Sequence, residues 1–232
     1  MSLNLESVKT DARKRFSEVY TYLTYVSSLE PTVPLSPANI EVKIMRGLFY
    51  VHLYSAIEKT VNEAIVATLS IIKSVNVKNK HLKTNFNAIT LHPTLQSFKT
   101  CKSDKFFLKA TDIFDGIDSL DVFPLNESMF SGYLQNIWYK TIEEIVNLFK
   151  LKCFSPESKA KLVIDEIVDK RNSVAHGRTS AAEVGQSHNS NILRDKMADA
   201  QTLVFLFVDV LEQYVSSKGF IRDEYRSIYS DM

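Results

Sequence analysis

"IMRGLFYVHLYSAIEKTVNEAIVATLSII", residues 44–72, decides the fold class of this chain. Its apolar residues fall on nearly every face of a helix instead of following one stripe. A helix that is apolar all round is buried among other elements. We therefore expect residues of about 38–73 to form a central helix that other helices surround.

Composition agrees with an all-α fold around this helix. The chain has 232 residues, 45% of them hydrophobic and 24% charged, which is enough for one globular domain over residues 1–232. Only 6 glycines and 6 prolines are present, too few for the turns of a many-stranded sheet. We predict an up-and-down bundle of about five helices.

Apolar residues at steps of three and four predict the other helices. "EPTVPLSP" at 30–37 ends the first helix, and residues 217–232 read as a loosely packed tail. In the fourth helix Ser155 can cap, Pro156 suits the first position, and Gly177 can close the helix in the left-handed conformation. The predicted helices cover about 3–29, 38–73, 126 or 128 to 151, 156–176 and 192–216.

Charge and cysteine content limit the partners and the compartment. A net charge of +1 excludes a uniformly basic nucleic-acid binder but allows a local basic patch. Cys101 and Cys153 form neither a zinc knuckle nor a disulfide framework, which favours the cytoplasm. "LVFLFVDVL" at 203–211 is too short to cross a bilayer, so no membrane association is expected.

Residues 74–125 are expected to be an irregular insertion with a local positive charge. No acidic residue occurs from Ala64 to Ser103. A solvated lysine-rich loop is one interpretation. The other is a path for a polyanion, with aromatic rings as stacking platforms. The residues concerned are Lys73, Lys78, Lys80, Lys83, Lys99, Lys102, His81, His92, Phe86, Phe98, Phe106 and Phe107.

"DKRNSVAHGR", residues 169–178, places polar groups at the end of the fourth helix. Asn172 and His176 share a face, and the side chain of Arg171 is long enough to reach them. Helix-end carbonyls favour a protonated imidazole, and a guanidinium binds phosphate oxygens, so the set suits RNA cleavage without a metal. In the alternative interpretation, Lys170, Arg171 and His176 only complement the helix dipole.

Three segments carry a resemblance to a known family. "RNSVAHG" at 171–177 resembles the R-[NDH]-x-x-x-H signature of the HEPN superfamily. "RGLFYVHLYSAIEKTVNEAI" at 46–65 is similar to the second helix of its RiboL-PSP and MAE-type branches. "NESMFSGYLQNIWYKTIEEIVNLFKL" at 126–151 is similar to the helix that precedes the signature. The resemblance covers about residues 40–215.

The resemblance implies a metal-independent endoribonuclease with a composite active site at a homodimer interface. Arg171 and His176 would be the catalytic pair, and Asn172 would position the histidine or the phosphate. RNA would be the substrate and no cofactor would be needed. A toxin or defence effector held by an antitoxin or regulatory protein fits this class, whereas the alternative is a non-catalytic module binding nucleotide, RNA or a protein partner.

Glu58 interrupts the apolar stripe of the central helix and is expected to need a partner, because a buried carboxylate is costly when unpaired. We expect Arg171 to be that partner and Glu58 to orient its guanidinium. The alternative is a wet groove in which Glu58 pairs with Lys59 or Asn62.

Three further cations are candidates for RNA contact. Lys170 and Arg178 flank the signature, and Arg46 either adds charge to the cleft or is an ordinary surface residue. Arg178 stands two residues after His176, where toxins of the family that nucleotidyltransferase antitoxins control often carry a modifiable tyrosine. Regulation by nucleotide transfer to that position is therefore not predicted.

Overall fold

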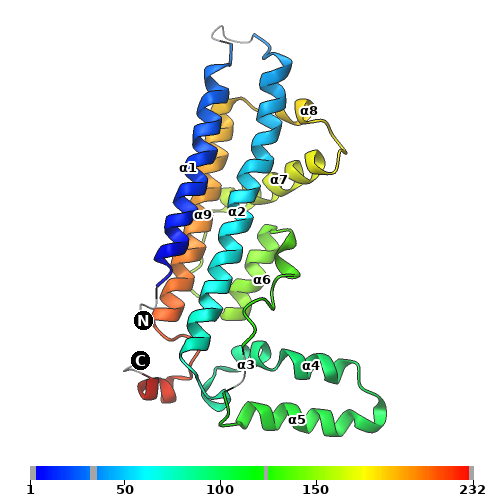
Figure 1. The fold of residues 1–232 in the computed structure, drawn as a ribbon, viewed down its shortest axis with the longest axis vertical. Helices are drawn as coiled ribbons and strands as arrows, with labels where there is room; N and C mark the ends of the chain where they lie inside the picture. Colours follow the sequence, from blue (N-terminus) through cyan, green and yellow to red (C-terminus); the bar gives the residue numbers. More distant parts are fainter. Residues whose placement is uncertain (1–3, 32–35, 123–124, 230–232) are drawn as a thin grey trace.

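The computed structural model describes residues 4–31, 36–122 and 125–229. These residues form helices and no β-strand, apart from an isolated antiparallel bridge between Leu82 and Ile221 (Figure 1). The predicted all-α class is confirmed. The first residue of the predicted 3–29 helix, and residues 32–35 of the predicted link, lie outside the described residues.

Three long helices run side by side and form the bundle: α1 (Glu6–Ser28), α2 (Ile40–Ser74) and α9 (Ser190–Ser216) (Figure 1). Asn39 caps α2, since its side chain accepts a hydrogen bond from the backbone N–H of Val42 at 2.9 Å. Besides α1 and α9, α2 contacts α7 and α8, so the prediction of a central helix is confirmed.

The signature helix is α7 (Ser158–Ala175), close to the predicted 156–176. Its C-terminus closes as predicted: Gly177 has φ +65°, and the backbone N–H of Arg178 donates to the carbonyl of Ser173 at 3.0 Å. The predicted N-terminus is wrong by two residues. The N-cap is Glu157, whose backbone is extended, so Ser155 does not cap and Pro156 stands outside the helix.

The helix before the signature, α6 (Tyr139–Phe149), is much shorter than the predicted 126–151. Before it the chain passes through turns and a short 3-10 helix. The backbone N–H of Ile137 donates to the Tyr54 hydroxyl at 2.9 Å, and that of Tyr139 donates to the Asp165 carboxylate at 2.8 Å. These bonds direct the chain onto α2 and α7, which is why the predicted helix is interrupted.

The predicted irregular insertion is mostly helical in its described part, residues 74–122. It contains α3 (Thr84–Thr90), α4 (His92–Lys99) and α5 (Phe106–Asp118). The last two pack against each other and project from the bundle as an arm (Figure 1). No residue of α4 is buried, and Gly116 is the one buried residue of α5. The weak periodicity of this region reflects its short helices: α3 enters the main core through Phe86 and Ile89, whereas α4 and α5 do not enter it.

The segment after α9 is packed, so the prediction of a loose tail is wrong for residues 217–229. Phe220 and Ile221 are completely buried. The backbone N–H of Arg222 donates to the carbonyl of His81 at 2.8 Å, and the Tyr229 hydroxyl lies 2.8 Å from His81 Nδ1. Residues 230–232 lie outside the described part of the chain.

A short helix that the sequence pattern does not predict, α8 (Ala181–Gly185), follows the signature. Ser180 and Glu183 form a capping box at its N-terminus. It packs on α2 closely enough that an added Cβ on Gly47 would lie 2.0 Å from the carbonyl oxygen of Ala181. An added Cβ on Gly185 would lie 1.8 Å from the carbonyl oxygen of Lys43. The two glycines therefore let α8 hold the end of α7 against α2.

We predict that Gly47→Ala lowers the free energy of unfolding by about 1–3 kcal/mol, because the added methyl group meets backbone that cannot move aside. Gly132→Ala is the matched control, since a methyl group added there would meet nothing within 4 Å. Urea unfolding followed by circular dichroism measures both variants. Equal stability of Gly47→Ala and the wild type would contradict the tight α2–α8 contact.

We also predict that stability falls as the pH drops below about 6.5. Burial lowers the pKa of His81, and the neighbouring Lys78, Lys80 and Arg222 lower it further. Below the ordinary histidine pKa the unfolded chain takes up a proton that the folded protein resists. Thermal unfolding at pH 7.5 and 5.5 should show the difference. The difference in Tm between the two pH values should shrink in His81→Gln and persist in the control His92→Gln. Equal pH dependence in both variants would refute the role of His81.

Candidate active site

Arg171 is held by groups from three parts of the chain. Its Cζ lies 4.4 Å from the centroid of the Tyr54 ring on α2, a cation–π contact. Its Nη1 donates to Asn172 Oδ1 at 2.7 Å on α7 and to Asn136 Oδ1 at 3.3 Å in the turn before α6. The guanidinium is therefore fixed in direction before any ligand arrives.

Glu58 lies beside Arg171, as predicted, with Oε2 3.9 Å from Nη2. The alternative partners are engaged elsewhere, because Lys59 pairs with Glu63 and the Asn62 amide donates to the backbone carbonyl of Glu58. Burial raises the pKa of Glu58, while the charge of Arg171 acts in the opposite direction. At 3.9 Å the two groups attract each other without a direct hydrogen bond, and the predicted role of Glu58 in orienting the guanidinium stays a prediction.

His176 is the C-cap residue of α7 and its side chain is exposed. Among the described residues the imidazole has no hydrogen-bond or ion-pair partner. Five residues separate it from Arg171, about 7.5 Å along the helix axis. Asn172 contacts Arg171 through its side chain and His176 only through its backbone carbonyl. The two predicted catalytic side chains thus lie at the same helix end without touching.

Two of the three predicted RNA-binding cations lie beside Arg171 and His176 at the end of α7. Lys170 is partly exposed and Arg178 is exposed, and neither forms an ion pair with another described residue. The prediction for Arg46 is wrong. Its side chain is 7% exposed and its Nη2 lies 2.7 Å from Glu30, so its charge is already compensated. Arg46 also lies twelve residues before Glu58 on α2, about 18 Å along the axis.

Sequence reasoning misses two groups that hold Arg171. The sequence indicates Tyr54 only as part of an apolar stripe, and it places Asn136 inside a predicted helix. An aromatic residue one helical turn before Glu58 is a usable signal for Tyr54, because residues four apart share a face. The contact of Asn136 depends on a turn that no local pattern indicates.

A second cluster of titratable groups joins α2, α7 and the start of α9. The Tyr50 hydroxyl lies 2.9 Å from Nδ1 of His188, which lies 3.8 Å from Glu166 Oε1. Lys196 pairs with the same carboxylate. Burial lowers the pKa of His188, and Lys196 lowers it further. These groups satisfy one another, which is typical of a structural network.

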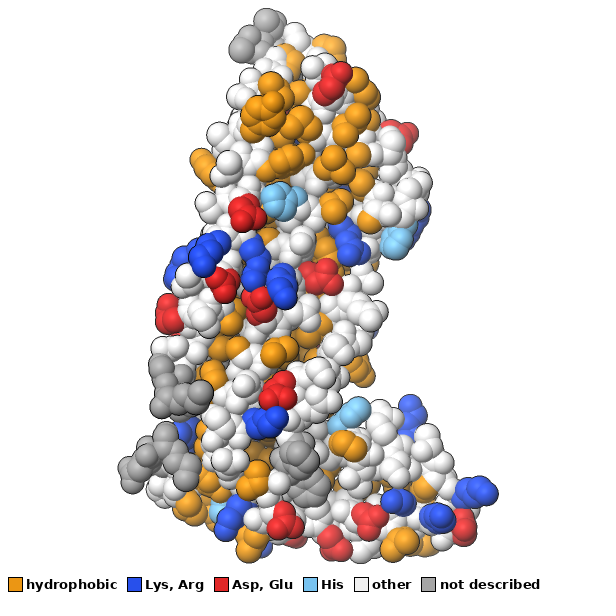
Figure 2. All heavy atoms as spheres, in the orientation of Figure 1, with side chains coloured by type: hydrophobic (Ala, Val, Ile, Leu, Met, Phe, Trp, Pro, Cys, Tyr) orange, Lys and Arg blue, Asp and Glu red, His pale blue; other side chains and the backbone are white. Residues whose placement is uncertain are grey.

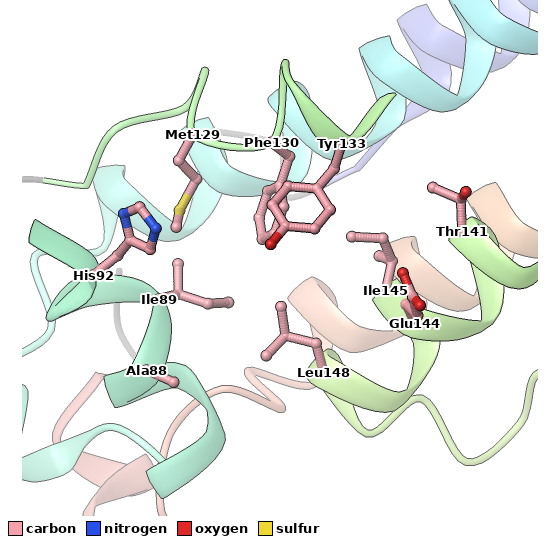
Figure 3. A pocket seen from close by; sticks show the side chains of 10 residues that line it. All are labelled: Ala88, Ile89, His92, Met129, Phe130, Tyr133, Thr141, Glu144, Ile145 and Leu148. Atoms are coloured by element: carbon pink, nitrogen blue, oxygen red, sulfur yellow. The ribbon is translucent and has the colours of Figure 1, made fainter. Parts of the chain in front are cut away.

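A mainly apolar cavity of about 330 Å³ lies between α3, the turns before α6, and α6 itself (Figure 3). None of its lining residues contacts Arg171 or belongs to the signature, so it is separate from the candidate site. Its lining residues are Ala88, Ile89, His92, Met129, Phe130, Tyr133, Thr141, Glu144, Ile145 and Leu148.

Two features are missing from the part of the chain that the structure describes. No three His, Cys, Asp or Glu side chains gather closely enough there to hold a metal ion. No helix in those residues combines the length and apolar character required to cross a membrane.

A helical bundle with an arginine, an asparagine and a histidine at a helix end agrees with the resemblance to the HEPN superfamily. The sequence model of the RiboL-PSP-HEPN family matches residues 11–217, which is most of the chain. The protein therefore belongs to the RiboL-PSP-HEPN family. No curated protein and no solved structure gives a significant match.

We predict that Tyr54→Phe lowers stability by about 1–3 kcal/mol, because it leaves the buried N–H of Ile137 without an acceptor. The aromatic face under Arg171 remains in this variant. Tyr133→Phe is the control, since that side chain is largely exposed. Chemical unfolding compares the two, and equal losses would show that the Tyr54 hydroxyl does not anchor the turn.

Proposed function

We propose that this protein is a metal-independent endoribonuclease that acts as a homodimer, with Arg171 and His176 as its catalytic residues. The observation that carries the proposal is the contrast between them. Arg171 is fixed by Tyr54, Asn136 and Asn172, whereas His176 has no partner in the described residues and lies exposed at the end of the same helix. A fixed cation and an accessible imidazole suit phosphodiester cleavage.

The proposed reaction is an internal transesterification of RNA. The ribose 2′ oxygen attacks the adjacent phosphorus, the bond from phosphorus to the 5′ oxygen breaks, and a 2′,3′-cyclic phosphate and a free 5′-hydroxyl result. An imidazole removes the proton from the 2′-hydroxyl or delivers one to the leaving 5′ oxygen. The guanidinium of Arg171 stabilises the negative charge that builds on the phosphoryl oxygens.

The separation of the two side chains supports the proposed dimer. One copy offers a single imidazole at this helix end, and that imidazole does not reach Arg171. A two-fold dimer that brings the ends of two α7 helices together supplies two of each group around one cleft. Lys170 and Arg178 would contact neighbouring phosphates. The cytoplasm is the expected compartment, and a toxin or defence role under an antitoxin or another regulator is the corresponding biological proposal.

The test is cleavage of mixed RNAs in EDTA by the wild type, His176→Ala and Arg171→Ala. Each variant should lose at least about 100-fold in rate, the usual contribution of a positioned acid or base. His92→Ala is the control histidine variant and should cleave normally. Light scattering and circular dichroism must show that all four proteins are equally folded and equally dimeric.

Mixing the two inactive variants tests the composite site. A heterodimer of His176→Ala with Arg171→Ala retains one intact arginine and one intact histidine on opposite copies, so partial activity should return. No recovery would mean that each site uses residues of one copy. If neither the wild type nor its variants cleave any RNA tested, the non-catalytic module is favoured instead.

A further inference from the structure

The free end of the arm carries aromatic side chains that the fold does not bury. Phe98 and Phe106 are in contact, with ring centroids 5.0 Å apart, and Phe107 packs edge-on against Phe106 at 5.5 Å. Phe107 is nevertheless 81% exposed and Phe106 is 46% exposed. We call residues 98–109 the arm tip. Figure 1 shows that the connection between α4 and α5 lies at the end of the arm farthest from the bundle.

The arm tip also holds three lysines whose charge no described acidic residue compensates. Between residues 99 and 111 there are four lysines and one acidic residue, Asp104. Lys99, Lys102 and Lys105 form no ion pair with a described residue, while Lys109 pairs with Asp112. Figure 2 shows basic side chains gathered at this free end of the arm.

The other lysines of the acid-poor region are mostly compensated by the fold. Lys73 lies 2.9 Å from Glu127, Lys80 lies 3.8 Å from Asp118, and Lys83 lies 3.7 Å from Asp223. Phe86 is 1% exposed, so its prediction as a stacking platform is wrong. Lys78 also lacks an ion pair with a described residue, but the exposed rings of Phe106 and Phe107 lie at the arm tip. The arm tip is therefore the part of this region that best fits a polyanion path.

Charge changes sign along α5, which indicates the kind of partner. Phe114 is also well exposed, at 68%, but it stands among Asp112, Asp115 and Asp118. A protein that docks on the apolar surface of α5 would cover Phe107 and Phe114 together. A polyanion would use the basic end and avoid the acidic one.

We propose that the arm tip binds single-stranded RNA, with a base stacked on Phe107 and phosphates held by Lys99, Lys102 and Lys105. Exposed aromatic rings among unpaired cations are the usual means of binding unpaired nucleotides, because every base presents a flat face for stacking. The arm projects to the same side of the bundle as α6 and α7 (Figure 1). The inference rests on the proposed ribonuclease function and adds unpaired RNA as the substrate class.

Binding is measured by fluorescence anisotropy with a labelled, fully 2′-O-methylated oligonucleotide, which has no 2′-hydroxyl to react. Phe107→Ala should weaken binding by about 5- to 100-fold, as expected for the loss of one stacked base. The matched control Phe114→Ala removes an equally large exposed ring from the acidic end and should bind like the wild type. Both side chains are exposed, so both variants should keep the wild-type Tm.

Salt dependence tests the lysines. In Lys102→Ala/Lys105→Ala the slope of log affinity against log salt should fall by about 1.4, or about 0.7 for each lost phosphate contact. Phe107→Ala should keep the wild-type slope. A duplex of the same sequence should compete poorly, because its bases are already stacked on one another.

Three results would overturn the inference: equal losses in Phe107→Ala and Phe114→Ala, equal competition by the duplex, or no binding by the wild type. The first would point to a protein partner on α5. Binding is separate from cleavage here, so the two proposals fail differently. If the protein binds RNA through the arm tip but does not cleave RNA in EDTA, only the ribonuclease proposal fails. If cleavage depends on His176 but RNA binding does not depend on the arm tip, only the arm-tip proposal fails.

Discussion

Burial of α2 among four neighbouring helices, which leaves only one stripe of it exposed, is the constraint on which the rest of the structure depends. A helix of 35 residues spans about 52 Å, and this one contacts α1, α7, α8 and α9 along that length. Because it is apolar all round, it is stable in water only when other helices cover it. Polar residues on its covered faces then need partners, and the candidate site includes one of them, Glu58.

Three ion pairs that hold the bundle together are closer than the pair at the candidate site. Lys9 with Asp209, Arg15 with Glu63, and Arg46 with Glu30 lie at 2.6–2.8 Å and join elements of the bundle. Arg171 and Glu58 lie at 3.9 Å. A direct pair at the site would satisfy the guanidinium and weaken its attraction for phosphate. The loose pair, with the Tyr54 ring beneath the cation, fixes the direction of Arg171 while leaving N–H groups for a ligand.

The parts of the fold that the sequence predicts are those that local patterns determine. The core helix follows from its apolar residues, the end of α7 from Gly177, and the partner of Glu58 from the cost of burying a carboxylate. The start of α6 depends on the Tyr54 hydroxyl and on Asp165, and the order of residues 217–229 depends on His81. These contacts join residues far apart in the chain, and periodicity carries no information about them. The prediction that Arg46 contacts RNA is wrong for the same reason, since its partner Glu30 comes from the residues just after α1.

A nearly neutral protein can still bind a polyanion if its charges are separated by more than the screening length. At physiological salt that length is about 8 Å. Lys109 lies at the boundary between the two ends of α5, since it pairs with Asp112 at 3.5 Å. Phe107 and Phe114, which stand near the basic and the acidic end, are seven residues apart, about 10 Å along the axis. Net charge therefore does not decide whether this chain binds RNA, because lysines without an ion-pair partner among the described residues can gather locally, as Lys99, Lys102 and Lys105 do at the arm tip.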